Sequence, residues 1–169
     1  MIEHNNETGK ELKGKIEKWF SRFNTVVIAG IGNSLRKDDF VGIEVVRQLK
    51  NKVPPNVHVI ECETVPESFI QSIEELKPSH VLIIDAALIN SKPGDSKLVD
   101  SKELQEQQAI STHALPLRIF CEYLLQTTEA KIALLAIQPQ DTSFGEGLTE
   151  ILEYSAKQLA ELLLKILRE

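Results

Sequence analysis

Runs of branched apolar residues alternate with helical patterns along the chain from residue 25 onward. Four such runs are short and mostly apolar, which is typical of buried strands, and they cover residues 25–30, 57–62, 80–86 and 131–137. Between them, apolar residues recur at three- and four-residue intervals, as in amphipathic helices. The alternation predicts an α/β domain with a mostly parallel sheet, because parallel strands need crossover connections that are usually helical.

Two further patterns complete the predicted sheet. The run at 80–86 is the most hydrophobic strand, so we expect it at the centre, where helices cover both faces. A turn at residues 92–95 (Lys-Pro-Gly-Asp) should return the chain as a hairpin, with residues 96–100 running antiparallel. The expected architecture is a three-layer α/β/α sandwich around a mostly parallel five-stranded sheet with one antiparallel strand.

The first part of the chain has an amphipathic helix of its own. Residues 9–23 place five apolar side chains on one helical face, namely Leu12, Ile16, Trp19, Phe20 and Phe23. We expect this helix to pack on the domain, and a partner-binding helix is the alternative. The predicted division is an N-terminal amphipathic helical extension over residues 1–24 and a single α/β domain over residues 25–169.

Composition narrows the class of protein. The 169 residues, 42% hydrophobic and 26% charged, suit one soluble domain. A formal net charge of −6 argues against nucleic acid as a partner. Two cysteines, Cys62 and Cys121, cannot form a disulfide framework, which favours a cytoplasmic location. No apolar run approaches the roughly 18 residues that span a bilayer, and the first residues lack a signal-peptide pattern, so we expect no membrane insertion.

Polar residues gather where the predicted strands end. The carboxyl ends of parallel strands meet at one edge, which is where open α/β sheets bind ligands. The features expected there are the loop 30–39, Asp85, His113 and Gln138. Gly30 and Gly32 make up only part of a dinucleotide-binding fingerprint, because the third glycine is missing. A nucleotide-binding domain is therefore a weaker alternative.

Two acids and one imidazole at this edge point to a metal site. Asp85 follows a strongly apolar strand, so its carboxylate needs a partner, a metal or an opening to solvent. Asp38 and Asp39 precede an apolar helix, which one of them could simply cap. Together, Asp39, Asp85 and His113 would form a three-ligand site suited to Zn, Ni, Fe or Mn. A metal held this way polarises a carbonyl and activates water, which promotes amide hydrolysis.

These residues also form the motifs of a known family. The sequence resembles the hydrogenase maturation endopeptidases, and in particular the branch that serves hydrogenase-3-like enzymes. The similarity covers residues 25–165 and lies in five motifs: Gly30-x-Gly32-Asn33-x-Leu35-x-x-Asp38-Asp39-x-x-Gly42, Thr64-x-Pro66-Glu67, Asp85-Ala86, Thr112-His113-x-x-Pro116-Leu117 and Ile137-Gln138-Pro139.

The resemblance implies a function. The domain would be a peptidase that removes the C-terminal extension of a nickel–iron hydrogenase large-subunit precursor after nickel insertion. The family's metal ligands correspond to Asp39, Asp85 and His113, which would also be the catalytic residues. The precursor would supply the nickel, and Zn or Cd could replace it in vitro. The alternative is a non-catalytic nickel-binding chaperone or docking module for the same precursor.

Other residues near the predicted metal receive supporting roles. Substrate positioning is expected of Gly32, Asn33, Asp38 and Gln138. Candidate apolar contacts to the precursor are Phe40, Leu115, Leu117 and Phe144. Many relatives carry Asp-Gly-Gly where this chain has Glu-Cys-Glu at residues 61–63. Glu63 could therefore add a carboxylate near the metal, and Cys62 could bind a soft metal.

Overall fold

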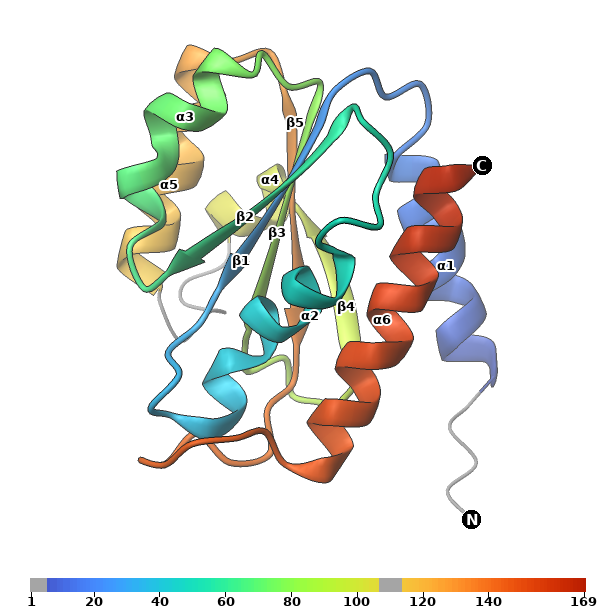
Figure 1. The fold of residues 1–169 in the computed structure, drawn as a ribbon, viewed down its shortest axis with the longest axis vertical. Helices are drawn as coiled ribbons and strands as arrows, with labels where there is room; N and C mark the ends of the chain where they lie inside the picture. Colours follow the sequence, from blue (N-terminus) through green and yellow to red (C-terminus); the bar gives the residue numbers. More distant parts are fainter. Residues whose placement is uncertain (1–5, 107–113) are drawn as a thin grey trace.

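A five-stranded sheet forms the centre of the protein (Figure 1). The structure is a computed structural model, and it describes residues 6–106 and 114–169. The strand order across the sheet is β2-β1-β3-β5-β4. The strand bounds in that order are Val57–Glu63, Val26–Ile31, His80–Ala86, Lys131–Ile137 and Ser96–Asp100.

The pairing confirms the predicted fold class and corrects one connection. β2, β1, β3 and β5 are parallel, and β4 alone is antiparallel. The predicted hairpin with the preceding strand is wrong, because β4 pairs with β5, which lies between β3 and β4. Burial explains the order. Six of the seven residues of β5 are buried, as in an inner strand, whereas β4 has a single buried residue, Val99, and suits an edge.

Helices cover both faces of the sheet. On one face lie α1 (Asn6–Trp19), α2 (Val41–Leu49) and α6 (Glu150–Arg168), which share a core with alternate residues of β1, β3 and β5. On the other face lie α3 (Ile70–Glu75) and α5 (Ala114–Thr127), which pack on the intervening residues. Because successive strand residues point to opposite faces, each inner strand contributes to both cores. The three layers are therefore a consequence of apolar strands that are hydrophobic on both sides.

Three short elements complete the described fold. α4 (Ser101–Glu106) follows β4, and its Leu104 packs on the same core as α5. Two single turns of 3₁₀ helix precede longer helices: η1 (Lys37–Phe40) leads into α2, and η2 (Pro66–Phe69) leads into α3. Both 3₁₀ turns follow a parallel strand, so they lie at the carboxyl edge of the sheet.

The N-terminal helix packs on the domain, as predicted. Ile16 is completely buried and Phe20 is 3% exposed in the core beneath α6, and the Trp19 ring meets the His80 ring edge-on at 5.0 Å. The helix ends at Trp19 rather than at residue 23, because the chain turns at Arg22, whose φ is +59°. The division of the chain at residue 24 stays a prediction. Within the described ranges, no helix is long and apolar enough to cross a membrane.

Candidate active site

Two aspartates lie at the carboxyl edge of the sheet, and both are completely enclosed. Asp39 belongs to η1 and Asp85 is the next-to-last residue of β3, and each is 0% exposed. Asp85 pairs in register with Ala136 of β5, one residue before both strands end. η1 contacts β3. The sequence therefore brings two acidic side chains, 46 positions apart, to one edge of the fold.

Glycine 42 explains how η1 comes so near the end of β3. A Cβ at Gly42 would lie 2.5 Å from the carbonyl oxygen of Ile31 and would also clash with the carbonyl oxygen of Ile84. Real Cβ atoms do not approach backbone oxygens this closely, so only glycine allows the first turn of α2 to lie against the ends of β1 and β3. Because Gly42 follows Asp39 by three residues, this contact also brings η1, which carries Asp39, to the strand that carries Asp85.

The two glycines of the first loop serve packing in the same way. A Cβ at Gly30 would lie 2.6 Å from the carbonyl oxygen of Gly42, and a Cβ at Gly32 would lie 2.7 Å from the carbonyl oxygen of Asp39. The space that these glycines leave is therefore occupied by η1 and α2, not open to a bound phosphate. This packing argues against the nucleotide-binding alternative, and it gives Gly32 a structural role in the loop.

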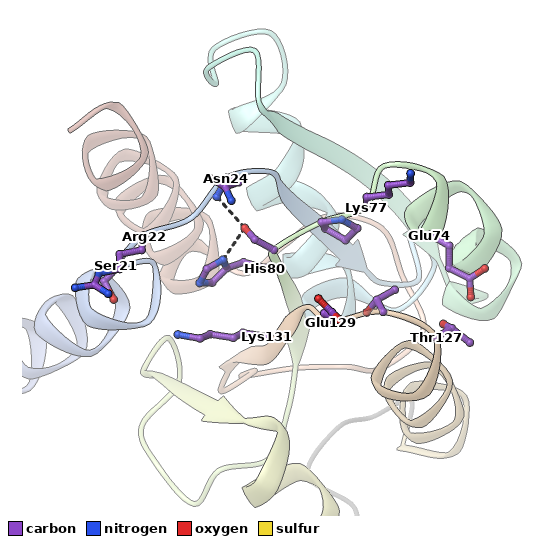
Figure 2. A pocket seen from close by; sticks show the side chains of 12 residues that line it. Ser21, Arg22, Asn24, Glu74, Lys77, His80, Thr127, Glu129 and Lys131 are labelled. Carbon is purple, nitrogen blue, oxygen red and sulfur yellow. Dashed lines mark hydrogen bonds between the residues drawn. The ribbon is translucent and has the colours of Figure 1, made fainter.

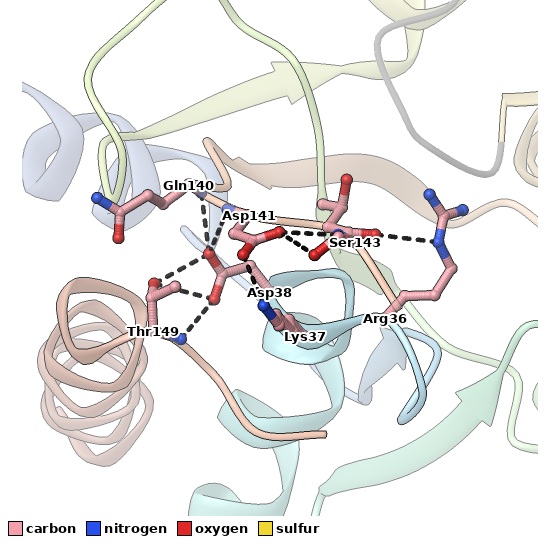
Figure 3. A network of polar contacts seen from close by, with 8 residues as sticks. Arg36, Lys37, Asp38, Gln140, Asp141, Ser143 and Thr149 are labelled. Atoms are coloured by element: carbon pink, nitrogen blue, oxygen red, sulfur yellow. Dashed lines mark hydrogen bonds and ion pairs between the residues drawn. The ribbon is translucent and has the colours of Figure 1, made fainter. Parts of the chain in front are cut away.

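Asp38 binds the far end of the chain instead of capping its own helix (Figure 3). Its Oδ2 accepts hydrogen bonds from the backbone amides of Gln140 and Asp141, both at 2.9 Å. Its Oδ1 accepts one from the amide of Thr149 at 2.7 Å, and the Thr149 hydroxyl lies 2.9–3.0 Å from both oxygens. Thr149 is the N-cap residue of α6. A buried carboxylate thus stabilises the positive end of a distant helix.

The residues that flank η1 make no cap of the predicted kind. Arg36 precedes η1 and Phe40 precedes α2, and neither forms a side-chain cap hydrogen bond. The Asp38 carboxylate is completely buried among these donors, so it holds the 138–149 loop in place, and its predicted part in substrate positioning stays a prediction.

Further contacts hold the same two loops together. Lys37 Nζ lies 2.8 Å from Asp141 Oδ2, and Arg36 Nε donates to the carbonyl of Thr142 at 3.2 Å. The amide of Lys37 donates to Gly145 at 3.0 Å. The Lys37 ammonium, followed by the Ser143 hydroxyl and amide, holds the pKa of the Asp141 carboxyl well below its usual range. The loop after β1 and the loop after β5 therefore form one hydrogen-bonded unit (Figure 3).

Asn33 and Gln138 shape the backbone of this edge. Asn33 Oδ1 accepts from the amide of Leu35 at 2.9 Å, a local turn that begins the η1 approach. Gln138 Oε1 accepts from the amide of Ile89 at 2.8 Å, which ties the loop after β3 to the end of β5. The direct substrate contacts predicted for these side chains remain predictions.

The predicted histidine ligand, His113, lies outside the described residues. Among the described residues, no group of three His, Cys, Asp or Glu side chains could hold a metal. The structure therefore brings Asp39 and Asp85 to one edge, and the three-ligand site stays a prediction.

Within the described residues, the Glu-Cys-Glu segment completes no group of three metal-binding side chains. Burial raises the pKa of the Cys62 thiol to about 12, so the neutral thiol predominates in the metal-free protein, and the predicted soft-metal binding stays a prediction. Glu61 pairs with Arg47, whose guanidinium lies 4.9 Å from the centre of the Phe40 ring. Glu63 is exposed, and its backbone carbonyl accepts the amide of Gly32 at 2.9 Å.

The predicted apolar contacts separate into core and surface. Leu117 is 3% exposed and belongs to the core beneath α5, and Phe40 is half-buried. Phe144 is 83% exposed on the 138–149 loop. The side chain of Leu115 lies outside the described residues. Of the three whose side chains the structure describes, only Phe144 offers a large apolar surface at the carboxyl edge.

A hollow at the opposite edge of the sheet is remote from the aspartates (Figure 2). It has a volume of about 1000 Å³, and its lining includes His80 and Lys131, the first residues of β3 and β5. The two aspartates lie at the other ends of the strands, so this hollow is not their cleft.

Sequence reasoning missed the residues that hold the site loops. Thr149 and the amides of the 138–149 loop are the partners of Asp38, and no local pattern links them to it. One signal was available for Thr149, because a threonine directly before a long amphipathic pattern marks a helix start. Gly42 was visible within the family motif, but its role depends on strands that it does not adjoin in sequence.

A family comparison agrees with this arrangement. The sequence model of the HycI hydrogenase maturation proteases matches residues 43–166. The chain belongs to this family of hydrogenase maturation proteases. It is therefore an endopeptidase of the kind that cleaves the C-terminal extension of a hydrogenase large subunit. Family membership does not favour the alternative of a non-catalytic docking module.

Individual relatives show the same similarity. The Escherichia coli K12 hydrogenase 3 maturation protease is 29% identical over 126 residues, which are 75% of this chain and 80% of the relative. The crystal structure of the [NiFe] hydrogenase maturation protease HycI from Thermococcus kodakarensis is 36% identical, with a TM-score of 0.85 over 92% of this chain and 99% of the other. The solution structure of the Escherichia coli endopeptidase HycI gives 26% identity and a TM-score of 0.72 over 82% and 88%.

Proposed function

We propose that Asp39, Asp85 and His113 bind the nickel ion of a nickel–iron hydrogenase large-subunit precursor, and that cleavage of the precursor's C-terminal extension depends on this ion. The nickel arrives with the precursor and is part of the substrate. Recognition of the metal would make processing follow nickel insertion. The observation that carries the proposal is the pair of enclosed carboxylates, Asp39 and Asp85, at the ligand-binding edge of a protein in this family.

The chemistry of the two carboxylates suits a divalent cation. Burial of a carboxylate in a low-dielectric environment is unfavourable unless hydrogen bonds or opposite charge offset it. Two carboxyl groups at one edge also supply the oxygen ligands that divalent cations bind. Carboxylate oxygens with one imidazole form a mixed donor set that nickel and zinc both accept. Zn or Cd are therefore expected to substitute in vitro.

The reaction is hydrolysis of one amide bond. A divalent ion polarises the scissile carbonyl or lowers the pKa of a water molecule, and either effect promotes attack on the amide carbon. Water adds across the C–N bond, leaving a carboxylate on the large subunit and an amine on the released peptide. The protein's part would be to orient the ion by Asp85 at the end of β3 and by Asp39 on η1, which Asp38 ties to the 138–149 loop.

The test compares precursor with and without nickel. Mass spectrometry of the precursor should show release of the C-terminal peptide only from the nickel-loaded form. Asp39→Asn and Asp85→Asn should each slow release by roughly a hundredfold or more, the scale on which loss of one charge-stabilising group slows catalysis. Glu129→Gln is the matched control, because Glu129 is an exposed acid at the opposite edge of the sheet.

A second measurement does not depend on cleavage. Calorimetry with nickel alone should detect binding to the wild-type protein and a weaker signal with Asp85→Asn, while circular dichroism reports whether each variant is folded. Equal cleavage of nickel-free precursor would overturn the metal dependence. Folded Asp39→Asn and Asp85→Asn variants with wild-type rates would overturn the proposed roles of these residues.

We further propose that the reaction takes place in the cytoplasm. Both cysteines, Cys62 and Cys121, are free and buried, as is usual where thiols stay reduced. Fractionation of cells that produce the protein, followed by immunoblotting, tests this location.

A further inference from the structure

Exposed apolar side chains gather at the edge that carries the two aspartates. Seven large apolar residues of the described chain are exposed, and four of them lie on loops that follow the parallel strands. Those four are Leu35 after β1, Val65 after β2, Leu88 after β3 and Phe144 after β5, with exposed fractions of 47%, 41%, 65% and 83%. Single exposed apolar residues are ordinary on any protein, but a group of them at one site indicates an interaction surface.

The loops that carry Leu35 and Phe144 are joined to each other. The amide of Gly145 donates to the carbonyl of Leu35 at 2.8 Å, and Arg36 forms an isolated parallel bridge with Gly145. The two side chains therefore extend from adjacent positions of one hydrogen-bonded unit. Leu88 precedes Ile89, whose backbone amide donates to the side chain of Gln138, the first residue of the loop that carries Phe144.

Phe144 is held outward by a loop that has little freedom. Asp141 binds Lys37 and Ser143 just before it, and Gly145 pairs with the backbone of Leu35 and Lys37 just after it. A loop fixed on both sides keeps the phenyl ring in solvent before any partner arrives. Such preorganisation lowers the entropy that binding must overcome.

Charged groups near these residues are mostly acidic. The exposed acids on the loops of this edge are Glu63, Glu67 and Glu146, and the exposed bases are Arg36 and Lys92. Lys37 is already paired with Asp141. An apolar surface with acidic surroundings is complementary to an apolar polypeptide segment that has basic residues beside it.

We propose that Leu35, Val65, Leu88 and Phe144 form the surface on which the hydrogenase large-subunit precursor docks, through an apolar segment flanked by basic residues. This inference rests on the proposed function, because the same edge receives the scissile bond. The surface contacts the precursor equally strongly in the bound ground state and in the transition state of cleavage. Loss of these apolar contacts therefore raises KM and leaves kcat, the rate of the chemical step, unchanged.

The test measures KM and kcat separately on nickel-loaded precursor. Phe144→Ala and Leu35→Ala should each raise KM roughly tenfold, as for a well-placed apolar contact at an interface, with kcat within about twofold of wild type. Tyr123→Ala is the matched control, since Tyr123 is 48% exposed on α5 toward its C-terminal end. This control should leave KM unchanged. Raising the salt concentration should increase KM for the wild-type protein, because screening weakens the acidic surroundings.

Each outcome bears on the inference. A wild-type protein that leaves nickel-loaded precursor intact overturns the proposed function, and this inference with it. Normal cleavage with unchanged KM in Phe144→Ala and Leu35→Ala overturns the docking surface alone. Sedimentation provides the remaining outcome: if Phe144→Ala converts a dimer into a monomer and leaves KM unchanged, the surface joins two copies of this chain and the inference fails.

Discussion

Replacement of Asp38 should loosen the loop at the candidate active site and destabilise the whole fold. Asp38 is 0% exposed, and four donors meet its carboxylate: the amides of Gln140, Asp141 and Thr149, and the Thr149 hydroxyl. Asp38→Ala leaves three backbone amides without an acceptor. At roughly 1 kcal/mol or more for each, the free energy of unfolding should fall by about 3 kcal/mol. Typical domains have about 5–15 kcal/mol in all, so this is a large fraction.

The isosteric variant separates charge from shape. In Asp38→Asn the side-chain NH₂ group replaces one carboxylate oxygen and faces backbone amides, which are donors as well. We therefore expect the free energy of unfolding to fall by about 2 kcal/mol, although the side-chain volume is unchanged. Thr149→Val is the matched control: it removes only the hydroxyl and should lose about 1 kcal/mol. Urea unfolding followed by circular dichroism measures these differences in the free energy of unfolding, provided that its slope against urea concentration, the m-value, is the same for each variant.

Hydrogen exchange locates the effect. The amides of Asp141 and Thr149 should exchange faster in Asp38→Asn than in the wild-type protein, because they lose their acceptor, while amides in β3 should change only with global stability. If Asp38→Ala unfolds within about 0.5 kcal/mol of wild type, a change typical of neutral surface positions, the reasoning about this network is refuted.

Two further predictions concern packing and pH. Gly42→Ala should lower the free energy of unfolding by about 1–3 kcal/mol, because the added methyl group would clash with the carbonyl oxygens of Ile31 and Ile84. Urea denaturation measures this loss, and an unchanged urea concentration at the midpoint of unfolding would contradict it. Burial, and to a lesser extent Lys131, lowers the pKa of His80, so the unfolded chain binds its proton more tightly and stability should fall as the pH decreases below about 6.5. His80→Phe should flatten that part of the stability profile, and an equally steep profile would refute the assignment.

Local sequence was sufficient for the elements and for the family. The period of the apolar residues predicted the strands and the helices that surround them, because burial repeats every two residues in a strand and every three to four in a helix. The turn at residues 92–95 was sufficient to predict that β4 runs antiparallel. The spacing of the glycines and acids was sufficient to recognise a maturation protease, since the motifs follow one another in a fixed order.

Only the tertiary structure decided which distant groups meet. β4 pairs with β5 because the neighbour of a strand depends on the connection across the whole sheet, which no local period contains. Asp38 stabilises the start of α6 through Thr149, 111 positions away, and Gly42 fits against carbonyls of two strands that it does not adjoin. The exposure of Phe144 follows from a loop fixed on both sides. Hydrophobicity along a chain determines which side chains favour burial, but hydrogen bonds between remote segments determine which of them remain at the surface.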